Sequence, residues 1–168
     1  VGAKAIGEGA NLGITQLGRV EFARAGGRIN TDAIDNSAGI NSSDLEVNIK
    51  IALGTLVRDG TLNYQQRNTF LAEMTDEVAQ LCLRNNYLQT LAISLAERRN
   101  LSDLPYHADF MKALEAAGHL NRKVEYLPKH VDLMEREAQG AGLYRPELAV
   151  ILAYAKNTLY AELLESEV

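Results

Sequence analysis

Two short extended stretches on either side of one helical stretch constrain the fold of the start of this chain. The candidate strands are "AKAIGEG" (3–9) and "GRINTDAI" (27–34), and "TQLGRVEFARAGG" (15–27) between them has helical spacing. Thr15 is a candidate N-cap, and Gly26-Gly27 ends the helix in the left-handed conformation that glycine permits. A span of about thirty residues is the length of a crossover connection. The sequence therefore predicts two parallel strands joined by a helix.

Beyond residue 50 nearly the whole chain has the pattern of amphipathic helices. In the segment that crosses this point, Ser43 and Glu46 fit a capping box for "SDLEVNIKIALGTLVRDG". Further helices are expected in "NYQQRNTFLAEM", "TDEVAQLCLRNNYLQTLAISLAERRN", "DLPYHADFMKALEAAG", "HVDLMEREAQG" and "YRPELAVILAYAKNTLYAELLESE". The prediction is a mostly α chain. Residues 1–50 form a partial α/β part, a Rossmann-like edge of two parallel strands with a crossover helix, and residues 51–168 form an all-α helical domain.

Some of these helices carry specific local predictions. Asn63 and Gln66 form a second capping box, and Pro105 is expected in the first turn of its helix. The last helix has one apolar stripe that should face a core, and it consists of Leu148, Leu152, Ala155, Leu159 and Leu163.

Composition excludes several classes of function. The 168 residues include 17 Lys and Arg against 22 Asp and Glu, a net charge of −5, and no basic run gathers on one stretch, which argues against nucleic acid as a partner. No apolar stretch approaches the roughly 20 residues of a membrane helix, and the start does not resemble a signal peptide. We expect a soluble cytoplasmic protein. The missing initiator Met favours a piece of a larger protein.

Metal and disulfide chemistry also lack the residues they need. Cys82 is the single cysteine, so we expect it to be a buried core thiol. His107, His119 and His130 lie too far apart for a metal-binding spacing, and we assign no metal site.

Polar residues follow both predicted strands and form the candidate binding site. Gly7, Gly9 and Gly13 have a spacing one residue longer than the dinucleotide fingerprint, and such glycine turns also occur without a ligand. Ligands of parallel sheets sit at the carboxyl ends of the strands, where Asn11 and Asn36 would project amides that can donate and accept hydrogen bonds. Turn asparagines also arise without a ligand. The spacing leaves a paired site and two ordinary turns as alternatives.

The same residues carry a resemblance to a known family. "GEGAN", followed by D-x-x-x-N-x-x-G-[IV]-x-x-S-x-x-E, resembles the second half of the nucleotide-binding domain of glutamate dehydrogenases. Over essentially the whole chain the sequence is similar to the very large bacterial NAD-specific glutamate dehydrogenases. Two departures concern the smaller enzymes of the family: "NSAG" replaces "NAGG" at Asn36–Gly39, and no Pro precedes Asp32.

This resemblance implies a function and a set of roles. The full-length enzyme would oxidise L-glutamate to 2-oxoglutarate and ammonia with NAD, as a homo-oligomer. Gly9, Asn11, Asn36 and Gly39 would bind the nicotinamide side of NAD, and Ser43 the α-carboxylate of the substrate. The catalytic Lys and its acid would belong to a substrate domain in the rest of the same polypeptide, so this chain would have no catalytic residue and would be inactive alone. The alternative is a free-standing helical interaction or regulatory module.

Overall fold

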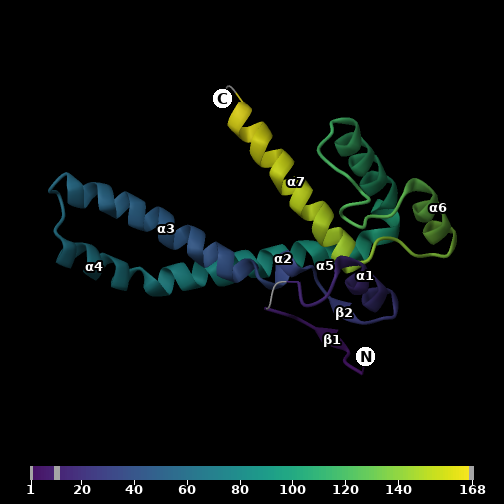
Figure 1. The fold of residues 1–168 in the computed structure, drawn as a ribbon, viewed down its shortest axis with the longest axis horizontal. Helices are drawn as coiled ribbons and strands as arrows, with labels where there is room; N and C mark the ends of the chain where they lie inside the picture. Colours follow the sequence, from purple (N-terminus) through teal and green to yellow (C-terminus); the bar gives the residue numbers. More distant parts are fainter. Residues whose placement is uncertain (1, 10–11, 167–168) are drawn as a thin grey trace. The chain divides into compact units, whose positions relative to one another are not determined.

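The computed structural model describes residues 2–9 and 12–166, and Figure 1 traces their helices and strands. By contacts the chain divides into two compact units, the first comprising residues 1–35 and 91–168 and the second residues 36–90. The elements are β1 (Ala5–Ile6), α1 (Gln16–Arg24), β2 (Arg28–Ile29), α2 (Asp32–Asp35), α3 (Ser37–Arg58), α4 (Tyr64–Glu73), α5 (Thr75–Ala116), α6 (His130–Ala138) and α7 (Arg145–Glu165). The predicted mostly α chain with a small α/β edge is confirmed.

The first unit begins with the predicted strand, helix and parallel strand. Ile6 of β1 lies opposite Ile29 of β2 in parallel register. The Thr15 side chain accepts a hydrogen bond from the Gly18 amide at 3.2 Å, and Gly26 takes a positive φ of 89° at the end of α1. Each strand has only two residues, and the short helix α2 begins at Asp32, soon after β2 ends at Ile29.

The core of the first unit lies around the start of α7. This helix contacts both α1 and β2. Arg145 Nε donates to Asn30 Oδ1 at 2.6 Å, and Gln16 Nε2 donates to the Pro146 carbonyl at 3.2 Å. The buried apolar cluster consists of Ile93, Leu104, Met111, Leu114, Leu120, Leu127, Leu133, Leu143, Leu148, Ala149 and Ile151.

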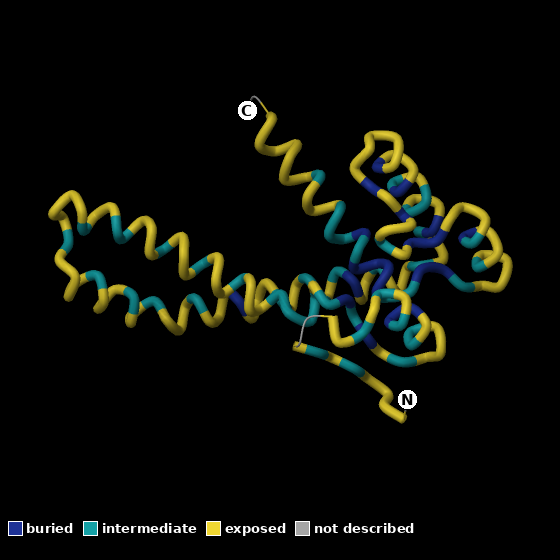
Figure 2. Tube along the Cα trace, in the orientation of Figure 1, coloured by how far each residue is buried: buried dark blue, intermediate teal, exposed yellow. Residues whose placement is uncertain are grey.

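The predicted apolar stripe of α7 is buried over only part of its length. Leu148 is 3% exposed and Leu152 is partly buried against the cluster, but Leu159 is 56% and Leu163 63% exposed. Figure 2 shows the exposed second half of α7. The expectation that the whole stripe faces a core is therefore wrong beyond Leu152, because only the first turns of α7 reach the buried cluster.

The second unit contains α3, α4 and the part of α5 up to Thr90, and α3 packs against α4. The capping box at the start of α4 is confirmed, since the Asn63 side chain accepts from the Gln66 amide and the Gln66 side chain from the Asn63 amide, both at 2.9 Å. Cys82 is buried as predicted.

One predicted break between helices is absent. Two helices were expected from residues 75 to 118, but α5 continues through Pro105. Proline costs about 3 kcal/mol inside a helix because it donates no hydrogen bond to the preceding turn. Leu104 and Met111 are 3% and 0% exposed on either side of it. We infer that burial of these side chains offsets the loss.

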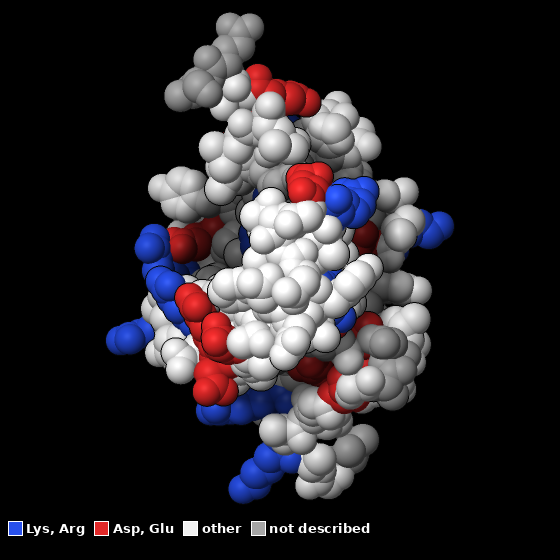
Figure 3. All heavy atoms as spheres, turned by 90° about the vertical axis from the view of Figure 1, so that its left-hand side faces the viewer, with Lys and Arg blue, Asp and Glu red and all other residues white. Residues whose placement is uncertain are grey.

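The part of the chain that the structure describes contains neither a candidate membrane-spanning helix nor a candidate metal-binding group. No helix there is both long and apolar enough to cross a membrane, and no group of three or more His, Cys, Asp or Glu side chains is placed to hold a metal ion. On the face drawn in Figure 3, acidic and basic side chains are interspersed among uncharged ones.

Candidate functional site

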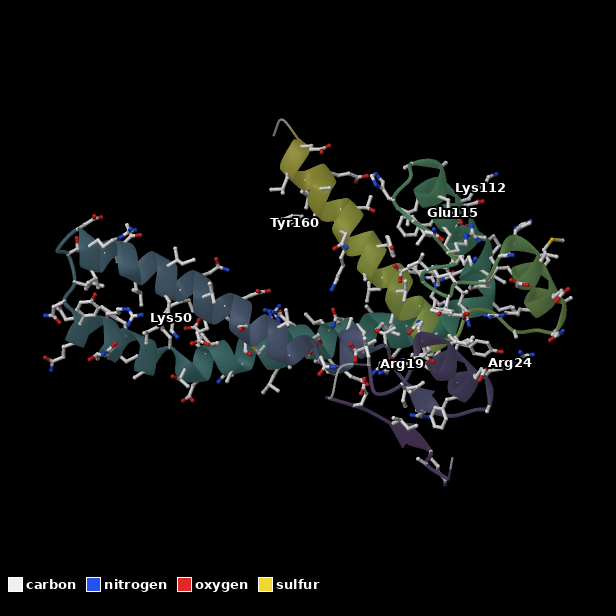
Figure 4. The ribbon with its side chains drawn as sticks, in the orientation of Figure 1. Arg19, Arg24, Lys50, Lys112, Glu115 and Tyr160 are labelled. Carbon is white, nitrogen blue, oxygen red and sulfur yellow. The ribbon has the colours of Figure 1, made fainter. Side chains whose placement is uncertain are left out.

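A buried arginine lies at the carboxyl edge of the two strands. Arg19 of α1 is 1% exposed, and its guanidinium lies 2.5 Å from a Glu8 oxygen, 3.5 Å from an Asp35 oxygen and 3.7 Å from an Asp32 oxygen. The same group donates to the backbone carbonyls of Ile14 and Asn30. Arg19 is therefore compensated in charge and in hydrogen bonds, as a buried cation must be. Figure 4 shows its position on α1.

The carboxylates around Arg19 also fix the loop that follows β1. The Glu8 amide donates to Asp35 Oδ2 at 3.1 Å, and the Leu12 amide to Asp32 Oδ1 at 3.0 Å. The hydrogen bond from Leu12, together with the interactions with Glu8 and Arg19, holds the pKa of the Asp32 carboxyl below its usual value. The loop after β1 thus lies against the segment after β2, at the edge where parallel strands place ligand-binding loops.

The sequence patterns did not predict this arginine cluster and pointed to Gly9 and Asn11 instead. Gly9 is exposed in the loop after β1, and Asn11 lies outside the described residues. A signal for the cluster does exist in the sequence, since acids follow both strands at Glu8, Asp32 and Asp35 while Arg19 stands next to the apolar Val20 on the intervening helix.

The remaining predicted residues lie on α3, which begins earlier than expected. Asn36 is its N-cap residue without a side-chain cap hydrogen bond, and Ser43 lies in the second turn. The proposed capping box of Ser43 and Glu46 is therefore wrong, and Glu46 instead pairs with Lys50 one turn later. The hydroxyl of Ser37 donates to Asn86 of α5, so the structure ties the first turn of α3 to its neighbour within the second unit.

Asn36, Gly39 and Ser43 share one face of α3. Spacings of three and four residues place side chains on the same side of a helix. Gly39 and Ser43 are exposed there and Asn36 is half-buried, while Leu45 and Ile49 on the opposite side are half-buried. The segment expected as a loop is thus one face of a helix. It presents the amide of Asn36, the backbone of Gly39 without a side chain, and the hydroxyl of Ser43.

Gly39 and Ser43 have chemistry that the chain itself does not use. A Cβ added at Gly39 would meet nothing within 4 Å, although glycine within a helix costs roughly 0.5–1 kcal/mol relative to alanine. No hydrogen bond among the described residues involves the Ser43 hydroxyl, whereas that of Ser42 donates to the Gly39 carbonyl at 2.9 Å. This face can therefore accept close approach of a ligand and donate a hydrogen bond to it.

Comparison with known proteins gives two family matches. Residues 1–96 match the family described as "Bacterial NAD-glutamate dehydrogenase, catalytic domain", and residues 140–168 match "Glutamate dehydrogenase, C-terminal". The first match covers more than half of the chain.

Curated relatives agree with these matches. The chain is 50% identical over 164 residues to the NAD-specific glutamate dehydrogenase of Pseudomonas aeruginosa, 49% over 167 residues to that of Mycobacterium tuberculosis and 47% over 165 residues to that of Halomonas elongata. These alignments cover 98–99% of the chain and 10% of each relative, so the chain spans about a tenth of their length. The resemblance inferred from the motifs is confirmed, and the chain belongs to the bacterial NAD-glutamate dehydrogenase family.

Proposed function

We propose that this chain works within a cytoplasmic, homo-oligomeric NAD-dependent enzyme that oxidatively deaminates L-glutamate to 2-oxoglutarate and ammonia. The observation that carries the proposal is the family match over residues 1–96, which includes the α3 face of half-buried Asn36 and exposed Gly39 and Ser43. NAD, when bound, supplies the hydride acceptor. The chain contributes to binding and orienting, and the rest of the polypeptide contributes the catalytic lysine and acid.

The α3 face has the groups that this role requires. The Ser43 hydroxyl donates to the α-carboxylate of glutamate or 2-oxoglutarate. The Asn36 amide both donates and accepts, as the carboxamide or ribose of the nicotinamide half demands. Gly39 leaves its backbone open to a close approach, which a side chain at that position would obstruct.

The remaining assignments rest on the family resemblance. Gly9, in the loop after β1, and Asn11 contribute to the nicotinamide side. Residues 1–50 form the C-terminal part of the dinucleotide-binding domain and residues 51–168 a helical C-terminal domain, with α3 running unbroken through residue 50.

A pair of adjacent serines tests the proposal in the full-length enzyme that contains this chain. Ser43→Ala should raise the glutamate KM by roughly ten- to a hundredfold, because a hydrogen bond to a charged group contributes about 1.5–3 kcal/mol. Ser42→Ala is the matched control, since its hydroxyl already bonds the helix backbone, and it should leave the glutamate KM unchanged. The KM for NAD should move little in either variant. Equal glutamate KM values for both variants would remove Ser43 from the substrate site.

One observation favours the alternative of a free-standing helical interaction module without catalysis. The second unit exposes large apolar side chains, with Ile40 66%, Val47 52% and Ile51 63% exposed. The mass of the natural polypeptide separates the two functions. Our proposal predicts a product about ten times as long as this 18.4 kDa chain, as in the relatives. A natural product of the chain's own mass would support the module instead.

A further inference from the structure

A cavity of about 580 Å³, with charged residues in its lining, lies in the first unit between the end of α5 and the start of α6. Pockets of this size hold small-molecule ligands. Four cationic side chains contribute to its lining: Lys112, Arg122, Lys123 and Lys129. The two carboxylates in the lining are those of Asp109 and Glu115. Lys112 and Glu115 come from the last turns of α5 (Figure 4).

The charge of this cavity is opposite to that of the whole chain. Its lining carries four cations against two carboxylates, whereas the chain has a net charge of −5. Within the described residues, Lys112, Lys123 and Lys129 form no ion pair with a carboxylate, and Glu115 is engaged by Arg122 at 2.9 Å. Uncompensated positive charge therefore remains available to a ligand.

Arg122 is the buried group of the cavity. Its side chain is 10% exposed, and one terminal nitrogen donates to the Pro128 carbonyl at 3.2 Å. Nε lies 2.9 Å from Glu115 Oε2 but makes no hydrogen bond with any described residue. This contact is an ion pair, so Arg122 is compensated in charge by Glu115 and forms a fixed, buried part of the cavity wall.

The start of α6 adds the field of a helix N-terminus to the same cavity. Lys129 is the N-cap residue and supplies no side-chain hydrogen bond to the first turn. The Asp132 carboxylate accepts from the Lys129 amide at 2.9 Å, which satisfies the amide that precedes the helix. The helix dipole favours negative charge at this position, and the Asp132 carboxylate in the first turn already supplies part of it.

We propose that this cavity binds the phosphate group of a small molecule. A tetrahedral phosphate offers several oxygens to donors that surround it, whereas a planar carboxylate offers two. Lysines act as point charges toward phosphate, and three of them line the same cavity as the buried Arg122. The proposal is independent of the substrate site on α3, because none of its residues belongs to the second unit.

Calorimetric titration of the full chain with inorganic pyrophosphate at low ionic strength tests the proposal. The double variant Lys112→Gln/Lys123→Gln should weaken binding by about tenfold or more, because charged hydrogen bonds to the ligand are lost. The matched control Lys4→Gln/Arg84→Gln removes the same charge from exposed positions outside the cavity and should stay within about twofold of the unmodified chain. Circular dichroism establishes that both variants are folded.

Two comparison ligands identify the chemistry. Glutarate, a dicarboxylate, should bind more weakly than pyrophosphate, and binding that is equal or tighter would overturn the choice of phosphate. AMP that binds tighter than inorganic phosphate identifies a nucleotide as the source, whereas equal affinity identifies the phosphate group alone. The absence of any heat with millimolar pyrophosphate, or equal weakening in the control variant, would overturn the proposal.

Discussion

Replacement of Arg19 by methionine should destabilise the first unit more than most substitutions in this chain. Methionine has a comparable length but neither the charge nor the donors of the guanidinium. The carboxylates of Glu8 and Asp35, 12% and 9% exposed, would then stay close together without a cation, and the Ile14 and Asn30 carbonyls would lose their donor. Removing one partner of a buried ion pair typically costs about 3–5 kcal/mol.

Urea unfolding followed by circular dichroism measures this loss. With a slope of about 1–3 kcal/mol per molar urea, the midpoint should fall by about 1 M or more. Arg24→Met is the matched control, because Arg24 is exposed in the last turn of the same helix (Figure 4), and it should change the free energy of unfolding by less than about 1 kcal/mol. Equal losses in the two variants would refute the assigned role of Arg19.

The pH dependence provides a second check on the same variant. The pKa of Asp32 in the folded chain is below its ordinary value of 3.8, so its contribution to stability is present above that value and is lost as the pH falls through the folded pKa. Arg19 contributes to that lowering. The difference in stability between wild type and Arg19→Met should therefore shrink in acid, where protonation neutralises the carboxylates.

Four further outcomes are expected. Gly39 and Gly54 both lie in α3 with open space around an added Cβ, so Gly39→Ala and Gly54→Ala should each stabilise the chain by about 0.5–1 kcal/mol. Only Gly39→Ala should raise the KM for NAD in the full-length enzyme. Equal KM values for NAD in the two variants would contradict the cofactor role of Gly39. Leu148→Ala should lower the free energy of unfolding by about 2–5 kcal/mol in urea, whereas Leu163→Ala should change it by less than about 0.5 kcal/mol. Burial lowers the pKa of His107 against the opposing effect of Asp103. The contribution of the neutral imidazole to the free energy of unfolding should therefore be fully present above the ordinary pKa of 6.5 and be lost as the pH falls through the folded pKa. His107→Leu should flatten this pH dependence of the melting temperature. The 168-residue chain alone should fold yet give no glutamate-dependent NADH absorbance, and turnover would show that it carries a self-sufficient site.

Helix ends that depend on neighbouring residues were predictable from the sequence. Thr15 caps α1 through the amide of Gly18, and Asn63 and Gln66 exchange hydrogen bonds across three residues. Such bonds require only a short polar side chain next to the first turn. Gly26 likewise takes its positive φ for a local reason.

Helix boundaries that depend on distant residues were not predictable. Ser43 and Glu46 satisfy the capping pattern, but Ser37 bonds to Asn86 and the N-cap is Asn36, seven residues earlier. A proline inside α5 has the pattern of a helix start, and the buried side chains on either side of it determine the outcome. In both cases tertiary packing outweighs the local signal.

The candidate sites also differ in whether neighbouring or distant residues form them. The spacing of Asn36, Gly39 and Ser43 can be read from the sequence. The three residues were expected in a loop, and the same spacing also brings them to one face of a helix. The Arg19 cluster draws Glu8 and Asp35 from segments on either side of α1, and no pattern over a short window reports that meeting.

The hydrogen bond from Arg145 to Asn30 has a consequence for the order of events during synthesis. These partners are 115 residues apart, and a ribosome adds about 5–20 residues per second, so roughly 6 to 23 s separate their appearance. A two-stranded sheet is marginally stable at best without a surface to pack on. The contact between β2 and the start of α7 therefore forms late in synthesis, only after the whole of α3, α4, α5 and α6 has been made.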